Sequence, residues 1–538
     1  MHLLATTVPV PYPSWLNTGD NTWQVVAATF VGLMSLPALA VLYASIVPKK
    51  MAVNVLAMMF AGFSLVLVAW VLWTYKMGFG ATSLGHGVSN GCQTWVGGGT
   101  QCASNLKLST GNWLQHFFDN FVGRPGQVTN AFNEQGQAVS AANTTIPFHF
   151  PTDSLVLFQF VFGAITPLLF IGSVLGRIKF SAWCLLIVLW STFVYGIDAF
   201  LLWGGGYFAQ EGALDFSGGF VIHMSAGVSG FVAAWVLGPR LAKDRQHFLP
   251  NNLVMAAVGA GILWLGWNGF NGGDPYYAGA DMSAAVVNTD LCTAVGVVTW
   301  MAMDAWLSKA KKPTFLGGVN GMICGLVGIT PCAGWVNGWG AILVGVIDTV
   351  IVWVCWNYLS KVRPFSKVDD ALGVVYTHGI AGFFGGLMLG VFGDPNMLEY
   401  GCGHLTASGQ VVSTSAGLYA SSSKTCSPSS VSGLMYTGSF HQLWEQFRAA
   451  LFVIFWSALV TFVIMQICRI VLRGLRYKDE VIEIGDTAMH DEEAFPEAPL
   501  AERVGGGGPG AFELAGLGKS GNPPTVRLDI GGPGNPIP

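Results

Sequence analysis

The feature that most constrains this chain is a series of apolar segments, each long enough to cross a membrane. About 20 apolar residues in an α-helix span a hydrocarbon core of roughly 30 Å. Charged residues make up only 10% of the sequence, whereas soluble domains carry roughly a quarter. We therefore predict an all-α integral membrane protein with eleven transmembrane helices near residues 23–47, 52–75, 154–176, 180–202, 217–238, 252–271, 282–307, 315–333, 336–359, 371–392 and 444–472.

The positions of lysine and arginine predict the orientation of these helices. Cytoplasmic loops carry an excess of both residues, and here they gather in alternate short loops, such as Lys49 with Lys50, and again after the last helix. We expect the N-terminus outside the cell and the C-terminus inside. The expected organisation is an extracellular N-terminal segment, a first five-helix repeat with one long extracellular loop, a second five-helix repeat, another extracellular loop, an eleventh helix and a cytoplasmic tail that is disordered after about 497: residues 1–22, 23–238 (loop 77–152), 252–392, 393–443, 444–472 and 473–538.

The net charge limits the partners that the chain can bind, and the positions of the cysteines indicate where disulfides are possible. A net charge of −4 leaves no broad basic face for nucleic acid, so the lipid bilayer is the expected environment. Four cysteines fall in pairs within the two long loops, on the face predicted to be oxidising. These pairs are candidate disulfides, with free thiols as the alternative: Cys92 with Cys102, and Cys402 with Cys426.

Each half of the chain has one histidine at a matching position. His223 and His378 are both followed by Ala, Gly and Gly at the third, fourth and seventh positions. Five helices per half make the second repeat inverted, and inverted repeats place transport sites between the halves near the membrane midplane. A histidine at that depth is expected to be neutral.

Three interpretations of the histidine pair remain. The rings are hydrogen-bonded core histidines, or they relay protons and hold a polar neutral solute, or they bind a metal. A metal is disfavoured because no Glu, Asp or Cys lies within one helical turn of either ring, and a metal site needs further ligands.

Aromatic residues and two aspartates collect near the ends of the same helices. The rings are Phe162, Trp203, Trp267 and Phe270. They form either an interfacial aromatic belt or a vestibule whose ring faces bind a small cation. Asp274, four residues after Phe270, would add negative charge, whereas Asp215 begins a helix and is suited to cap its N–H groups.

Four stretches now carry a resemblance to a known family. In order, WGGGYFAQEGALDFSGGFVIHMSAG, LGWNGFNGG, GLVGITPCAG and VDDALGVVYTHGIAG resemble the signature segments of the ammonium transporter family (Amt/Mep/Rh), over about residues 15–495. Details are most similar to the branch that includes the plant type 2 ammonium transporters. The resemblance implies a homotrimer of eleven-helix subunits in the plasma or inner membrane, each with its own pore, without a cofactor or enzymatic activity.

The resemblance also implies roles for individual residues. It implies Phe162 and Phe270 as a stacked gate, Trp203 as part of an outer ammonium recruitment site supported by Asp215, and a pore lined by Trp267 and the twin histidines His223 and His378. Two apolar residues, each four positions before one of these pore residues, are expected to form the pore wall: Leu263 and Val374.

The sequence departs from the family pattern at three places. Asp274 stands where the recruitment site often has serine, Gly373 stands where a third aspartate is frequent, and Asp491 follows the tail histidine where glycine is usual. We therefore expect a more acidic recruitment site. In the tail, Thr487 is the candidate regulatory residue, and a PII-type protein is the candidate cytoplasmic regulator.

These observations favour an ammonium transporter. Ammonium would be recruited at an outer vestibule and deprotonated, and ammonia would pass the twin histidines with or without the proton. Two other classes are weighed against it. One is a sensor that signals ammonium through the tail, and the other is a membrane enzyme with a metal at the histidines.

Overall fold

The computed structural model describes residues 15–80, 112–140, 146–397 and 431–495, residue 13, and the backbone of 92–93 and 101–102. Met1–Ala494 form one compact unit, and of the second unit, Phe495–Pro538, only Phe495 is described. The predicted cysteine pair Cys402 and Cys426 lies outside the described residues.

Ten helical stretches among the described residues are long and apolar enough to cross a membrane. This confirms the expected helical membrane architecture at that level. They are Thr18–Ile46 (α1 Thr18–Leu33, α2 Leu39–Ile46), Lys49–Phe79 (α3 Ala52–Ala69, α4 Tyr75–Phe79), Thr152–Val174 (α7 Thr152–Leu169, α8 Ile171–Val174), Phe180–Glu211 (α9 Phe180–Trp190, α10 Gly196–Leu202, α11 Tyr207–Glu211), Gly219–Leu237 (π-helix η5 Gly219–Met224, α12 Ser225–Leu237), Leu253–Gly273 (α14), Ala280–Leu307 (α15), Gly338–Lys361 (α17 Gly338–Asn357), Val375–Phe392 (π-helix η8 Val375–Ile380, α18 Ala381–Phe392) and His441–Val471 (α20).

Further short elements join these stretches. Helix α16 (Phe315–Ile329) is apolar but shorter. The other short α-helices outside the long stretches are α5 (Trp113–Asp119), α6 (Ala131–Gln135), α13 (Ala242–Gln246), α19 (Leu434–Thr437), α21 (Asp479–Ile484) and α22 (Asp486–His490). Within the long stretches lie the π-helices η1 (Met34–Ala38), η3 (Trp70–Thr74) and η4 (Ser191–Tyr195). The described residues also form two strand pairs: β1 (Cys92–Gln93) with β2 (Gln101–Cys102), and β3 (Gln137–Ser140) with β4 (Ile146–Pro151).

Polar side chains begin several of the long helices. Asn252, Thr314 and Asn337 each accept a hydrogen bond from a backbone N–H in the first turn of α14, α16 and α17. Such caps satisfy donors that have no partner within the helix. Because they come just before apolar runs, they fix where each of these helices starts.

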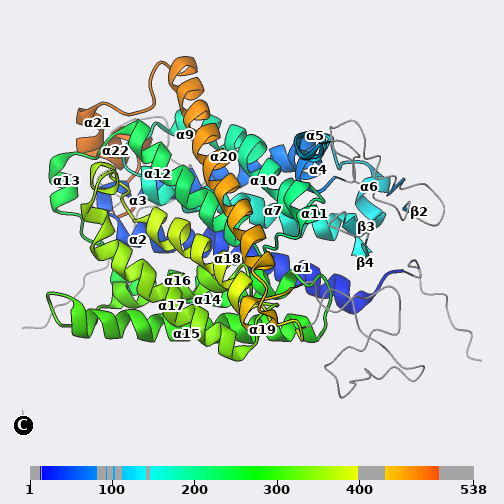
Figure 1. Cartoon of the computed structure of the whole chain (residues 1–538). Helices are drawn as coiled ribbons and strands as arrows, with labels where there is room; N and C mark the ends of the chain where they lie inside the picture. Colours follow the sequence, from blue (N-terminus) through cyan, green and yellow to red (C-terminus); the bar gives the residue numbers. More distant parts are fainter. Residues whose placement is uncertain are drawn as a thin grey trace, which may run out of the picture. The chain divides into compact units, whose positions relative to one another are not determined.

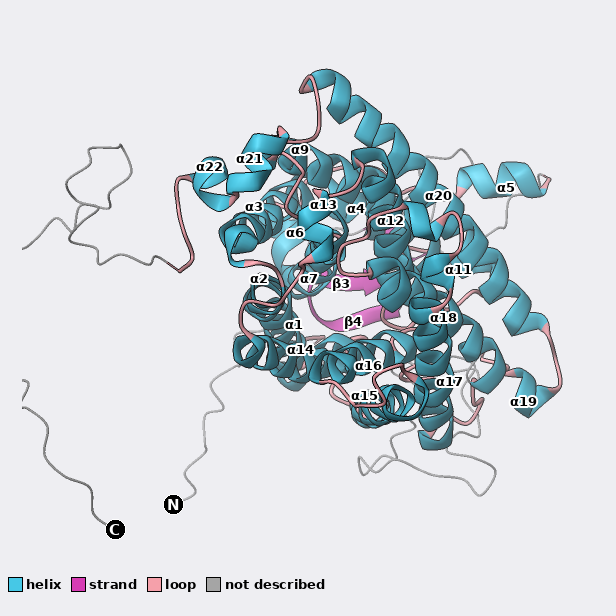
Figure 2. Cartoon of the chain, turned by 90° about the vertical axis from the view of Figure 1, so that its left-hand side faces the viewer, coloured by secondary structure: helices cyan, strands magenta, loops and turns pink. Residues whose placement is uncertain are grey.

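The two ends of the helical unit carry different elements (Figure 1). We call one the hairpin end, which holds α5 and the β3–β4 pair, and the other the tail end, which holds α13, α21 and α22. In β3–β4, Gln137 pairs with Pro151 and Ser140 with Ile146. Viewed from the tail end, many of the long helices are seen nearly end-on, whereas α20 runs obliquely; α15, α16 and α17 are grouped together and α1 lies beside α14 (Figure 2).

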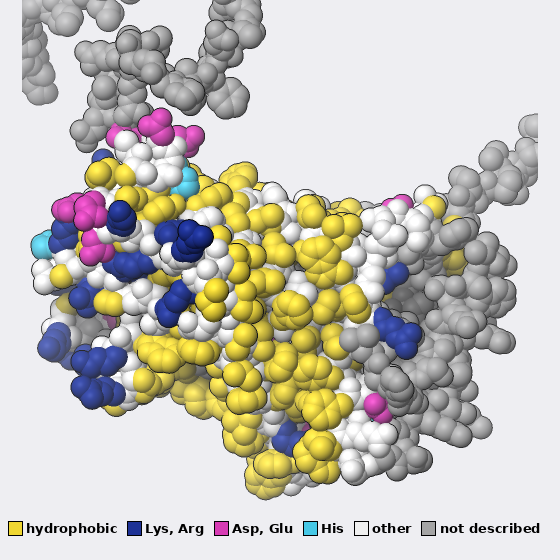
Figure 3. Space-filling view, turned by 90° about the horizontal axis from the view of Figure 1, so that it is seen from above, with side chains coloured by type: hydrophobic (Ala, Val, Ile, Leu, Met, Phe, Trp, Pro, Cys, Tyr) yellow, Lys and Arg dark blue, Asp and Glu magenta, His cyan; other side chains and the backbone are white. Residues whose placement is uncertain are grey.

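Apolar side chains cover the middle of the surface seen in Figure 3, and Lys and Arg gather toward the tail end. Large exposed apolar residues occur along α20, among them Phe455, Leu459 and Ile470. Exposed side chains of this kind suit contact with lipid. The arrangement agrees with a helical unit that lies across a bilayer.

The structure describes the side chains of six cysteines and only the backbone of Cys92 and Cys102. These six cysteines are free, all in or next to the long helices: Cys184, Cys292, Cys324, Cys332, Cys355 and Cys468. The backbones of Cys92 and Cys102 are direct partners in the antiparallel β1–β2 pair. Directly opposed residues in such a pair have Cα atoms about 4.5 to 5.5 Å apart, a separation that a disulfide can bridge. The disulfide itself stays a prediction.

Candidate functional site

Two π-helices carry the predicted histidines. His223 lies in η5 and His378 in η8, and each π-helix continues as an α-helix, α12 or α18. Short π segments within α-helices are rare and occur frequently at functional sites. The matching spacing read from the sequence thus corresponds to the same local structure in both halves.

The structure brings the two histidines together. Their ring centroids are 5.4 Å apart and the ring planes differ by 14°. Both rings are buried. Among the described residues, neither ring nitrogen of His223 has a hydrogen-bond partner, and Nδ1 of His378 has none either. Buried polar atoms are normally paired, so the interpretation of hydrogen-bonded core histidines is disfavoured.

The glycine at the fourth position after each histidine lies where the two halves cross. A Cβ atom on Gly227 would be 2.2 Å from the backbone nitrogen of Gly379, and one on Gly382 would be 2.4 Å from the carbonyl oxygen of Gly219. Each of these glycines therefore meets the π-helix of the other half. The close crossing is what places one ring beside the other.

Aromatic rings continue the stack from His223 toward the hairpin end. Trp267 lies parallel to His223, with centroids 5.2 Å apart and planes 16° apart. Phe270 stacks on Phe162 with centroids 4.1 Å apart, and Phe162 meets Trp203 edge-on at 6.4 Å. The predicted gate, pore and recruitment rings thus form one continuous series. The rings at its core are buried, which disfavours a simple interfacial belt for them.

Asp215 lies at the start of η5 as a cap. Its two carboxylate oxygens accept hydrogen bonds from four successive backbone N–H groups, those of Gly218, Gly219, Phe220 and Val221. Its own carbonyl oxygen accepts a hydrogen bond from Trp203 Nε1 at 2.6 Å. Asp215 therefore shapes both the start of η5 and the position of Trp203.

Sequence reasoning missed the corresponding aspartate of the second half. Asp370 Oδ2 accepts a hydrogen bond from Val375 N at the start of η8 (2.8 Å), and Oδ1 accepts one from Ser173 (2.8 Å). Asp370 precedes His378 by the same eight residues that separate Asp215 from His223. That equal offset was the signal in the sequence.

Asp274 lies near Phe270, one of the two predicted gate rings, and is held there by Ser217. It is buried and accepts a hydrogen bond from the hydroxyl of Ser217. The Ser217 hydroxyl also lies 3.2 Å from the carbonyl oxygen of Phe270. The carboxylate is therefore held within reach of the gate rings by a residue that directly follows the Asp215 turn.

The departure at Gly373 has a structural reason. Gly373 has a φ of +68°, in the left-handed region that favours glycine. A Cβ atom there would also be 2.2 Å from the ring of Trp356. An aspartate at this position would have to overcome both obstacles.

Leu263 and Val374 are buried at the positions where a pore wall was expected, on α14 and at the start of η8. Neither has a contact with a pore histidine that settles the assignment. Their role in the wall stays a prediction.

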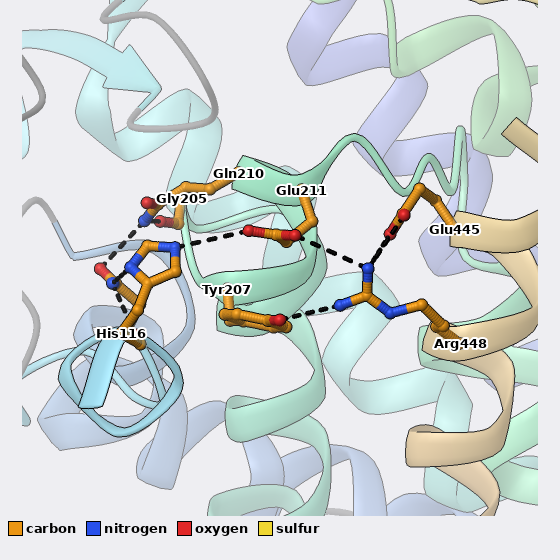
Figure 4. Close-up of polar contacts among 8 residues, drawn as sticks. His116, Gly205, Tyr207, Gln210, Glu211, Glu445 and Arg448 are labelled. Carbon is orange, nitrogen blue, oxygen red and sulfur yellow. Dashed lines mark hydrogen bonds and ion pairs between the residues drawn. The ribbon is translucent and has the colours of Figure 1, made fainter. Parts of the chain in front are cut away.

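A hydrogen-bonded chain braces the loop after Trp203 (Figure 4). Gln210 Nε2 donates to the carbonyl oxygen of Gly205 (2.7 Å) and to Asn120 Oδ1 (2.9 Å). This fixes the Asn120 amide so that its nitrogen faces His116 Nδ1, 3.1 Å away. Nδ1 of His116 must then accept, which leaves the ring proton of neutral His116 on Nε2.

The chain continues from His116 to α20. His116 Nε2 lies 3.6 Å from Glu211, and Glu211 lies 3.6 Å from Arg448. Arg448 pairs with Glu445 at 2.9 Å and donates to the Tyr207 hydroxyl at 2.8 Å. Figure 4 shows these side chains reaching across from three separate elements. The loop that carries Trp203 and Asp215 is thereby tied to both α5 and α20.

At the tail end, charged residues join the two halves. Arg240 contacts both carboxylate oxygens of Asp369, at 2.7 and 2.9 Å. Burial raises the pKa of Asp369, but the hydrogen bonds and charge of Arg240 outweigh burial and leave this pKa below its ordinary value. Nearby, burial lowers the pKa of Arg177 to about 10. Arg177 therefore remains protonated at neutral pH.

The beginning of the tail docks on α3. Asp486 accepts hydrogen bonds from Val53 N (2.7 Å) and Asn54 N (2.9 Å), and His490 bonds to the Asn54 side chain (2.9 Å). Asp491 has a φ of +57°, a conformation that glycine adopts most readily and aspartate tolerates.

Thr487 is exposed and donates a hydrogen bond to Glu493. Nothing in the structure tests its predicted regulatory role. Among the described residues, no group of three or more His, Cys, Asp or Glu side chains could hold a metal ion.

Comparisons with known proteins agree with this geometry. Residues 22–495 match the model of the Ammonium Transporter Family. Ammonium transporter 3 member 2 of Oryza sativa subsp. japonica is 40% identical over 501 residues, 91% of this chain and 94% of that protein. Ammonium transporter 2 of Arabidopsis thaliana is 39% identical over 486 residues, 90% and 89% of the two chains.

A solved structure shows the same fold. The crystal structure of Saccharomyces cerevisiae Mep2 superposes with a TM-score of 0.68 at 23% identity, covering 87% of this chain and 90% of that one. The resemblance to this family, and to its plant members, is therefore confirmed. The family and the relatives are transporters rather than enzymes. This chain is a multi-pass protein of the cell membrane that belongs to the Ammonium Transporter Family.

Proposed function

We propose that this protein is an ammonium transporter that recruits ammonium at the hairpin end, removes one proton and conducts ammonia past His223 and His378. The observation that carries the proposal is the buried histidine pair with unpaired ring nitrogens, which lies beneath a stacked pair of phenylalanines. The names of the relatives supply the substrate.

Recruitment uses the faces of aromatic rings and one carboxylate. A small cation near aromatic faces gains about 0.5 to 2 kcal/mol per ring, and Trp203 and Phe162 present such rings at the hairpin end. The Asp274 carboxylate adds charge attraction next to the gate. Asp215 contributes indirectly, because its carbonyl oxygen holds the indole of Trp203.

Conduction beyond the gate requires loss of the charge. An unpaired ion in an apolar, buried path is prohibitive, whereas ammonia is small and neutral. Ammonium gives up one proton and becomes ammonia, which uses the free histidine nitrogens as hydrogen-bond partners. The proton either returns to the hairpin side or follows through the histidines and pore water.

The proposed topology has eleven transmembrane helices. The ten long apolar stretches and the shorter α16 supply the eleven, and the basic residues at the tail end support an N-terminus outside and a C-terminus inside. The equal offsets around both histidines support a five-plus-five inverted repeat followed by one extra helix. We extend this to a homotrimer with one pore per subunit.

The folded part of the tail is where a cytoplasmic PII-type regulator would bind. Helices α21 and α22 lie on the face that the topology puts inside the cell, and they are already docked on α3 through Asp486 and His490. A regulator would therefore meet an ordered surface.

Electrophysiology on proteoliposomes tests the proposal. Solid-supported membranes record current and a pH-sensitive dye records substrate flux after an ammonium jump at two pH values. His223→Ala and His378→Ala should each lose most of the flux, whereas His247→Ala, which removes an exposed histidine outside the pore, should retain it. Parent-like current and flux in both pore variants would refute the histidine role.

A further inference from the structure

The segment GLVGITPCAG was singled out in the sequence but has no role in the transport path described so far. It forms the end of α16 and the turn after it, and Thr330 is the C-cap residue. Thr330 is fully buried. Its position next to the pore raises the question of what its hydroxyl group does.

Thr330 holds Trp267. The indole Nε1 of Trp267 donates a hydrogen bond of 2.9 Å to Thr330 Oγ1, and the Thr330 hydroxyl donates its own hydrogen to the carbonyl oxygen of Leu326 at 2.7 Å. The hydroxyl proton is thus committed to α16, and a lone pair of Oγ1 is left for the indole. Both partners are buried, so the bond is shielded from water.

The orientation of this indole matters because its ring also stacks on that of His223. Trp267 comes from α14, whereas His223 comes from η5, and the two rings lie parallel at 5.2 Å. Rotation of the indole about its side-chain bonds would lose both the bond to Thr330 and the parallel contact. The last torsion of a tryptophan is broad, so an anchor at Nε1 restricts it.

The same segment also contacts the turn that carries the Asp274 partner. The carbonyl oxygen of Thr330 accepts a hydrogen bond from Ser217 N (3.1 Å), and that of Pro331 accepts one from Phe216 N (3.1 Å). These bonds involve backbone atoms and would survive a side-chain substitution. The hydroxyl of Thr330 can therefore be removed without detaching the turn.

We propose that Thr330 is a positioning residue for conduction, whose hydroxyl oxygen fixes the Trp267 indole parallel to His223 in the pore. This inference rests on the proposed function and deepens it. It assigns the hydroxyl of the GITP segment to the geometry of the conduction path, with no part in recruitment at Trp203.

The chain offers a matched control for this contact. Trp73 Nε1 donates to Thr192 Oγ1 at 2.9 Å, and the Thr192 hydroxyl donates to the carbonyl oxygen of Val188 at 2.8 Å. These three residues make the same two hydrogen bonds, indole to hydroxyl and hydroxyl to carbonyl, as Trp267, Thr330 and Leu326. Neither Trp73 nor Thr192 has a ring contact with the pore histidines, so the control removes the same type of bond elsewhere.

The experiment compares Thr330→Val, Thr330→Ser and Thr192→Val in proteoliposomes. Initial ammonium flux is measured against ammonium concentration and normalised to folded transporter. Thr330→Val should lower the maximal rate by about tenfold, equivalent to about 1.4 kcal/mol, with an unchanged half-saturating concentration. Thr330→Ser should restore the rate, and Thr192→Val should transport like the parent even where its thermal midpoint falls.

A double variant separates positioning from a general packing effect. Trp267→Phe removes the indole N–H, so adding Thr330→Val to it should lower the maximal rate no further. Additive losses, a parent-like rate in Thr330→Val, or an equal loss in Thr192→Val would overturn the inference while the parent still carries ammonium. A parent without ammonium flux would instead overturn the proposed function.

Discussion

The crossing of the two halves at Gly227 leads to a prediction that the structure makes quantitative. Gly227 belongs to α12 and faces the π-helix η8, and its missing side chain leaves room for the backbone of Gly379. We expect Gly227→Ala to destabilise the protein and to reduce its transport. The substitution adds a single methyl group, so its effect is confined to this contact.

The magnitude follows from the distances. The new Cβ atom would lie 2.2 Å from Gly379 N and 2.4 Å from Gly379 Cα, whereas ordinary contact begins at 3.4 Å. The helices must therefore separate by about 1 Å, since a backbone cannot turn aside as a side chain can. Overpacking costs about 1 to 3 kcal/mol, and the better helix propensity of alanine returns about 1 kcal/mol. We expect a net loss of about 1 kcal/mol, and at most about 2 kcal/mol.

The assay combines thermal unfolding in detergent with ammonium flux. Gly32→Ala is the control, because its Cβ atom would meet only Val161 at 3.9 Å. Gly227→Ala should lower the unfolding midpoint by about 1 to 2 °C and reduce flux per folded protein, since His378 lies next to Gly379 and moves with it. Gly32→Ala should unfold at or slightly above the midpoint of the parent, because alanine has the better helix propensity, and should transport like the parent. If Gly227→Ala also matches the parent, the close crossing does not constrain the pore.

Two further predictions concern aspartates that lie outside the membrane spans. Asp215→Asn leaves one acceptor oxygen for four N–H groups, so we expect a loss of about 1 to 3 kcal/mol and reduced flux, measured by thermal unfolding and transport. The lowered pKa of Asp369 means that its contact with Arg240 stabilises the fold above the ordinary aspartate pKa and is lost as the pH falls through the lowered value. The unfolding midpoint should therefore fall as the pH drops below about 4, and Asp369→Asn should remove this part of the decline.

Local spacing made much of this fold predictable. Long apolar runs predict membrane helices because the bilayer leaves few other structures for a backbone. Equal offsets after His223 and His378 predicted a shared structural element, and in the structure the glycines of that pattern lie at the crossing. The ring series from Trp203 to the histidines was predicted mainly by family resemblance, because spacing alone left an aromatic belt open.

Other features were not readable from spacing. The chain of contacts in Figure 4 joins His116, Glu211 and Arg448. Because these residues are far apart in the sequence, no local sequence pattern predicts that they meet. From the sequence alone, Gly373 stands where an aspartate is frequent in the family, with no evident cause. The structure explains the glycine by its positive φ and by the neighbouring Trp356 ring. Thr330 belongs to a recognised motif, yet only the three-dimensional contact assigns its hydroxyl to Trp267.

The pore therefore combines a repeated frame with parts that occur once. The frame has three parts: the aspartate eight residues before each histidine, the π-helix that contains the histidine, and the glycine four residues after the histidine. Each part occurs in both halves. The stacked phenylalanines and Asp274 lie toward the hairpin end, and the indole held by Thr330 stacks on His223, the histidine of the first half. In the proposed transport path a symmetric frame supports conduction in either direction, so we expect the selection of ammonium to come from the unrepeated parts. Substitutions in the frame should then change the conduction rate, and substitutions at the gate should change which cations compete with ammonium.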